Sequence, residues 1–273
     1  MNGARIDFAR RLSAGLAAGA LALASAPPAH AQFGGAEATA VKPGFLLPAG
    51  EARILVFRPE IAVGEQTTGG LNEPNADWTR QARANLMAAL ARSKAMQGNR
   101  VVPAPELERP EGTLLNDYTA LFKAVAFAAF NHKMFPGNRL PTKKSDFDFT
   151  LGEGAAALKP LGGDYGLFFY SNDSFGSTGR KVAQILGAVM GMGLMSSGVH
   201  VGYAGLVDLS TGDLVWLNAD LAMGGDPRTA EGADKRIAQL LEDFPRKRLP
   251  SDPLPPSGTV KVDVPPETPG KKP

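Results

Sequence analysis

The chain has 273 residues and no cysteine, with 29 basic and 27 acidic side chains. The lack of cysteine excludes a thiol nucleophile, a cysteine-based metal site and a lipid anchor on a processed amino-terminal cysteine. A chain of this length can bury enough apolar surface to fold without disulfides. Basic and acidic residues are nearly equal in number, so the chain has no excess of positive charge of the kind that is typical of nucleic-acid binding.

Residues 1–31 have the three parts of a secretory signal. Three arginines precede a short apolar run, and the sequence Ala-His-Ala ends at Ala31 as a small-x-small cleavage site. The run is too short to stay as a membrane span. We therefore expect cleavage after Ala31 and a periplasmic protein. The signal holds three arginines and one aspartate, so the mature chain has 26 basic and 26 acidic residues.

The remaining chain divides into three parts by composition. Residues 32–50 are rich in Gly and Ala and predict a flexible lead-in, and residues 51–244 alternate between strand and helix patterns. Residues 245–273 are rich in proline and small polar residues, with few apolar groups to offset the entropy of ordering. This composition predicts a disordered tail.

Within 51–244 the apolar periodicity predicts an ordered series of elements. They are a strand at 52–63, a helix at 76–96, a strand at 99–106, a helix at 112–133, a short helix ending near Lys159, a strand at 165–170, a strand pair at 199–209 and 214–221, and a helix at 229–244. The second half of the helix at 112–133 is apolar nearly all round, which predicts deep packing. This order predicts a single α/β domain: a mixed sheet flanked by helices, with a late β-hairpin and a C-terminal helix.

We interpret the late hairpin, residues 207–220, as a structural element. Gly212 stands where a tight turn needs a positive φ, and Asp208 and Thr211 can satisfy the amides of the turn. Trp216 belongs to the second of the two paired strands. We therefore expect these residues to build the turn and do no chemistry.

Two short stretches carry a resemblance to a known group of proteins. They are Gly163-Asp164-Tyr165 at the start of a strand, and the hairpin with Val207, Asp208, Thr211, Gly212 and Trp216. This pattern resembles bacterial envelope accessory proteins such as the curli-secretion lipoprotein CsgG, the penicillin-binding-protein activator LpoB and the TolB amino-terminal domain. The resemblance implies a periplasmic scaffold that binds a protein partner. Many of those relatives are lipoproteins, whereas this chain lacks the cysteine that would carry the lipid.

The segment 182–199 is rich in Gly and Met and admits three interpretations. As a flap between strands it could dock a partner through Gly187, Met190, Gly191, Met192 and Met195. As a copper(I) site it could use Met190, Met192, Met195 and His200. As a membrane-contacting helix it is just long enough, although its polar residues and glycines make it weakly hydrophobic.

Residue patterns for catalysis are sparse. The two histidines of the mature chain lack the helical spacing of a metal site, no Gly-x-Ser-x-Gly elbow occurs, and residues 171–181 depart from a phosphate loop. An enzyme would have to gather Asp164, Asp173 and Asp208 in one cleft. We expect no cofactor and no catalysis, and a partner of the cell envelope bound through a sheet edge or through 182–199. The copper(I) site is the alternative.

Overall fold

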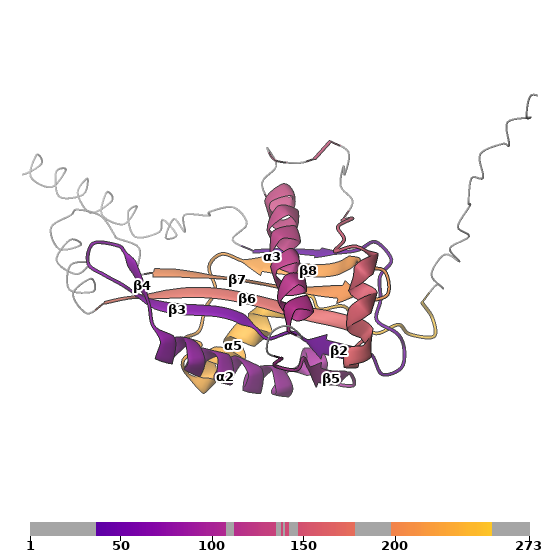
Figure 1. Cartoon of the computed structure of the whole chain (residues 1–273), viewed down its shortest axis with the longest axis horizontal. Helices are drawn as coiled ribbons and strands as arrows, with labels where there is room; N and C mark the ends of the chain where they lie inside the picture. Colours follow the sequence, from indigo (N-terminus) through magenta and orange to yellow (C-terminus); the bar gives the residue numbers. More distant parts are fainter. Residues whose placement is uncertain are drawn as a thin grey trace, which may run out of the picture. The chain divides into compact units, whose positions relative to one another are not determined.

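An eight-stranded mixed sheet lies at the centre of the computed structural model, and this confirms the predicted α/β class (Figure 1). The structure describes residues 37–107, 112–134, 138, 140–141, 147–177 and 198–252. The strands are β1 (Glu37–Val41), β2 (Arg53–Val56), β3 (Glu60–Gln66), β4 (Asn72–Pro74), β5 (Arg100–Pro103), β6 (Tyr165–Gly176), β7 (Gly198–Asp208) and β8 (Leu214–Asp220). The helices are α2 (Ala76–Arg92), α3 (Thr113–Met134) and α5 (Ala230–Leu240), with the 3-10 helices η1 (Lys94–Met96) and η3 (Glu153–Leu161).

The sheet is built around the long strand β6. Across the sheet the strands follow the order β1-β8-β7-β6-β2-β5, and β3 pairs with both β6 and β4. Strands β6, β7 and β8 are successive antiparallel neighbours, whereas β2 and β3 run parallel to β6. This mixture follows from the sequence, because helical crossovers separate the early strands and a tight turn joins β7 to β8.

The single strand expected at 52–63 is two strands in the structure. The chain leaves the ladder after Phe57 and pairs again from Glu60, so that β2 and β3 lie parallel to successive parts of β6. Pro59 lies in the break, and a proline has no amide hydrogen to donate to a ladder. Residues beyond 63, where the expected strand ends, extend β3 to Gln66, and the chain returns as β4.

Two apolar cores lie on opposite faces of the sheet. Helices α2 and α5 pack side by side over one face, and α3 with η3 covers part of the other (Figure 1). Both helices of the first face begin at side-chain caps: Asn75 accepts from the Trp78 amide, and Thr229 accepts from the Gly232 amide. The first core includes Trp216, and the second centres on stacked phenylalanine rings.

The segments before and after the predicted domain contribute to the fold more than composition suggests. Strand β1 lies inside the expected lead-in and pairs antiparallel along β8. Within the expected tail, Lys247 bridges to Leu47, and Arg246 binds Asp252 at 2.7 Å. The pairing of β1 with β8 and the bridge between Leu47 and Lys247 join residues far apart in the sequence, which local composition does not report. Residues 253–273 lie outside the described part of the chain.

Candidate functional site: an apolar groove beside helix α3

A groove of about 580 Å³ runs between α3 and the sheet. One wall is the helix stripe Ala120, Ala124 and Phe127, with Phe130 one turn further along. Positions separated by four and then three residues lie on one face of a helix, so this stripe is distinct from the one that enters the core. Sequence analysis missed the groove, because an apolar helix shows no sign of which side stays uncovered.

Phe127 shows the difference from expectation most clearly. The second half of α3 was expected to pack deeply, yet the Phe127 side chain is 66% exposed. Phe122, Ala126 and Ala129 on the opposite side of the helix are buried in the core. An exposed phenylalanine on the wall of an apolar groove is a feature typical of binding surfaces.

The floor of the groove is formed by two tyrosines and by apolar residues of the strands. Tyr170 of β6 stands opposite Tyr203 of β7 in the sheet register, and the two rings stack with centroids 4.8 Å apart. Val201 and Leu221 extend the floor beyond them. Burial, followed by the nearby Tyr170 and Glu60, raises the pKa of Tyr203, so this phenol stays neutral.

Lys123 is the one charged side chain among the described lining residues, and its charge is compensated. Its Nζ donates to Glu60 Oε2 at 2.7 Å and lies 5.4 Å from the centroid of the Tyr170 ring. The hydrogen bond with Glu60 is the largest cause that raises the pKa of Lys123. The groove is therefore neutral overall and suits an apolar occupant.

A buried polar cluster lies on the other face of the sheet. Asp173 and Arg236 are both fully buried, and two guanidinium nitrogens meet the two carboxylate oxygens at 2.8 and 3.1 Å. Ser171 donates to the same carboxylate at 2.7 Å, and His200 Nδ1 lies 2.9 Å from it. The remaining guanidinium hydrogens bind the carbonyls of Gly224 and Gly225. Because its groups satisfy one another, the cluster ties α5 to β6 and β7.

Arg228 extends this network toward α2. Its guanidinium carbon lies 3.9 Å from the Phe175 ring centroid and 4.3 Å from that of Trp78, and Asp226 holds its other side. Phe175 in turn lies 4.9 Å from the His200 ring. Two cation–π contacts of this one arginine join the end of β6 to the start of α2.

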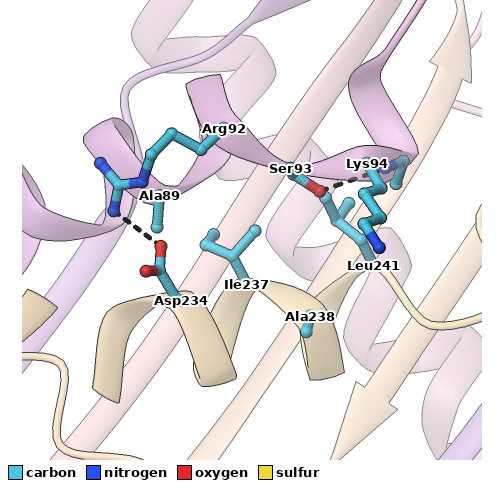
Figure 2. Close-up of a pocket in the computed structure, with 9 residues that line it drawn as sticks. Ala89, Arg92, Ser93, Lys94, Asp234, Ile237, Ala238 and Leu241 are labelled. Carbon is cyan, nitrogen blue, oxygen red and sulfur yellow. Dashed lines mark hydrogen bonds and ion pairs between the residues drawn. The ribbon is translucent and has the colours of Figure 1, made fainter. Parts of the chain in front are cut away.

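A second cleft of about 580 Å³ lies between the end of α2 and α5 (Figure 2). Arg92 of α2 reaches across it to Asp234 of α5 at 2.7 Å, and both side chains are about half exposed. Ile237 and Leu241 form its apolar base. An exposed ion pair over an apolar base is an ordinary seam between two helices.

The hairpin residues lie where the sequence places them. Gly212 has φ +77°, Asp208 accepts from the Ser210 amide at 2.7 Å, and Thr211 accepts from the Asp213 amide at 3.2 Å. Trp216 is fully buried. These residues lie at the opposite end of β7 from the groove and do not contribute to it.

Residues 182–197 of the Gly/Met segment, with Gly187, Met190, Gly191, Met192 and Met195, lie outside the described part of the chain, whereas Gly198 and Val199 begin β7. His200, the fourth residue of the copper alternative, is described and has its Nδ1 on Asp173. Across the ranges that the structure describes, His, Asp and Glu form no group of three that could hold a metal ion. No helix among those residues is long and apolar enough to cross a membrane.

The three aspartates of the enzyme hypothesis are not brought together. Asp164 forms a bidentate ion pair with Arg53. Asp208 lies near it, because Asp208 pairs in the sheet with Tyr165, the residue that follows Asp164. Asp173 lies nine residues further along the same extended chain, roughly 30 Å away at strand spacing. The structure therefore offers no cleft in which the three carboxylates meet.

No protein-family model matches the chain, and no curated protein matches it. Among solved structures, it is similar to the PelC dodecamer from Paraburkholderia phytofirmans, at a TM-score of 0.35 and 13% identity over 78% of this chain and 99% of that chain. A single-substitution PelC dodecamer from the same organism matches at a TM-score of 0.33 with the same identity and coverage. These values are too low to bear on fold or function.

Tyr165 provides a test of the packing around the start of β6. Burial, together with the charges of Asp208 and Asp164, raises the pKa of Tyr165 to about 12. The unfolded chain loses this proton near pH 10, whereas the folded protein keeps it until about pH 12. The tyrosine's contribution to stability is therefore present below pH 10 and is lost as the pH rises toward 12. Urea unfolding between pH 9 and 11 should show stability falling with pH, and less steeply in Tyr165→Phe. Equal slopes would contradict the raised pKa.

Proposed function

We propose that this protein is an exported, non-enzymatic accessory protein that binds a protein partner of the cell envelope in the groove beside α3. One observation carries the proposal: Phe127 is 66% exposed on the wall of a neutral, apolar groove of about 580 Å³. Export is supported by the signal-like sequence of residues 1–31. Apolar grooves with an exposed aromatic residue commonly serve as anchoring sites in protein interfaces.

The proposal differs in place from the sequence-based expectation. That expectation put the partner on a sheet edge or on residues 182–199. The groove is favoured because the large aromatic side chain of Phe127 faces solvent on its apolar wall. The groove's one ammonium group, on Lys123, binds Glu60, so the described lining holds no uncompensated cation.

Photo-crosslinking in cells tests the proposal. We expect the full chain with p-benzoylphenylalanine in place of Phe127 to form a crosslink to one reproducible envelope protein. The same probe in place of Leu121, which is 40% exposed on α3 outside the groove lining, is the matched control and should not form it.

A charge on the groove wall provides the second half of the test. Phe127→Glu should weaken co-purification of that partner by at least about tenfold, as expected for an aromatic anchor, while Leu121→Glu leaves it unchanged. Both variants should keep the wild-type free energy of unfolding within roughly 0.5 kcal/mol, because both side chains are exposed. Equal crosslinking from the two positions would rule out the groove as the binding site.

A further inference from the structure

The two faces of the sheet are covered unequally in the part of the chain that the structure describes. On one face α2 packs on β3 while α5 packs on β7 and β8, and the two helices touch along their length. On the other face, the strip beside α3 leaves Ala62, Val199 and Leu221 exposed. The groove therefore has a helix as one wall and the sheet as its floor. On the opposite face of the sheet, α2 and α5 show that two helices can pack side by side in such a setting.

The strands of the floor exclude an extended peptide as the occupant. Strands β6, β7 and β8 each have a paired neighbour on both sides, so none offers a free edge to an added strand. An extended chain lying on them would bury its own amide and carbonyl groups without partners. A helix satisfies these groups internally and presents only side chains, so it can enter the groove without this cost.

The charge of the groove narrows the chemistry of the occupant. The ammonium group of Lys123 is paired with the carboxylate of Glu60, and the buried phenol of Tyr203 is neutral. Phosphate or carboxylate headgroups are bound most strongly by an uncompensated cation, which the described lining does not supply. The complementary surface is the apolar stripe of an amphipathic helix, with residues at i, i+3, i+4 and i+7.

The exposed area argues against a second copy of this chain as a stable partner here. Phe127, Val199 and Leu221 are 66%, 46% and 43% exposed. Together they offer on the order of 300 Å² of apolar surface, against about 800 Å² that each partner loses in a standard interface. A patch of this size suits one short helix.

We propose that the α3 groove takes a single amphipathic helix of the partner protein, with Phe127 packed against its apolar stripe. This inference rests on the proposed function and specifies the partner's binding element. The small side chains of Ala120 and Ala124 let the bound helix approach α3 closely, at the 8–10 Å axial separation of packed helices. The stacked rings of Tyr170 and Tyr203 form part of the floor beneath it.

The test uses two synthetic peptides of identical composition with the full-length processed protein. One 18-residue Leu/Lys peptide has leucines at the helical spacing, and the other alternates Leu and Lys at the strand spacing. We expect the helical peptide to bind, as measured by fluorescence anisotropy, and the alternating peptide to bind at least about tenfold more weakly. Phe127→Glu should reduce binding of the helical peptide by at least about tenfold, and Leu121→Glu by less than about twofold.

Other occupants appear as distinct outcomes that would overturn the inference. These are preferential binding of myristate, a dimer in sedimentation that Phe127→Glu abolishes, and a Phe127 crosslink to residues 178–197 of the same chain. If the cellular crosslink forms but maps to an extended segment of the partner, the helix inference fails and the proposed function stands. If no crosslink forms at all, the proposed function fails as well.

Discussion

Replacing Arg236 with methionine is expected to destabilise the fold by about 3–5 kcal/mol, because it leaves the carboxylate of Asp173 buried without its partner. Both side chains are fully buried, and no other cation of the described residues forms an ion pair with Asp173 except His200 when protonated. Arg236→Met also removes the donors to the carbonyls of Gly224 and Gly225. Urea unfolding at pH 7 measures the loss.

Three further variants separate charge from packing at this cluster. Arg236→Lys keeps the charge but cannot form the bidentate contact, so an intermediate loss is expected. The double replacement Asp173→Leu with Arg236→Met should recover part of the loss, since no charge then stays buried. Arg92→Met breaks the half-exposed pair with Asp234 and should cost less than about 1 kcal/mol. Equal losses for Arg92→Met and Arg236→Met would refute the burial argument.

Gly212→Ala is expected to destabilise the protein by about 3–5 kcal/mol, which is large for one added methyl group. The first cause is the φ of +77°, which costs roughly 1–2 kcal/mol for a residue with a side chain. The second is steric: a Cβ at this position would lie 2.0 Å from the Gly152 carbonyl oxygen. That carbonyl cannot move freely, because the Leu151 amide donates to the Gly212 carbonyl at 2.7 Å and links the two segments.

Gly44→Ala is the matched control for Gly212→Ala. Gly44 has φ +74°, nearly the same value, but a Cβ there would meet nothing within 4 Å. The control should show only the conformational cost of about 1–2 kcal/mol. The difference between the two variants in thermal or urea unfolding isolates the close approach to Gly152. If the two glycines tolerate alanine equally well, the contact with residue 152 carries no weight.

The sequence by itself determined the local order of this protein. Apolar periodicity placed α2 and α5, whose caps in the structure are Asn75 and Thr229. One glycine in a Ser-Thr-Gly-Asp turn placed the β7–β8 hairpin. These features depend on residues close together in the chain, whose spacing is visible in the sequence.

Tertiary structure decided everything that depends on which segments meet. Strand β1 has little pattern of its own and forms because β8 offers it a ladder. Asp173, His200 and Arg236 are far apart in the sequence. The register of β6 with β7 and the packing of α5 bring them together. The groove is the extreme case, because Phe122 and Phe127 lie in the same helix and only the position of α3 on the sheet buries the first and exposes the second. Packing places each side of a helix against a neighbour or against solvent, and that choice is not a property of the local sequence.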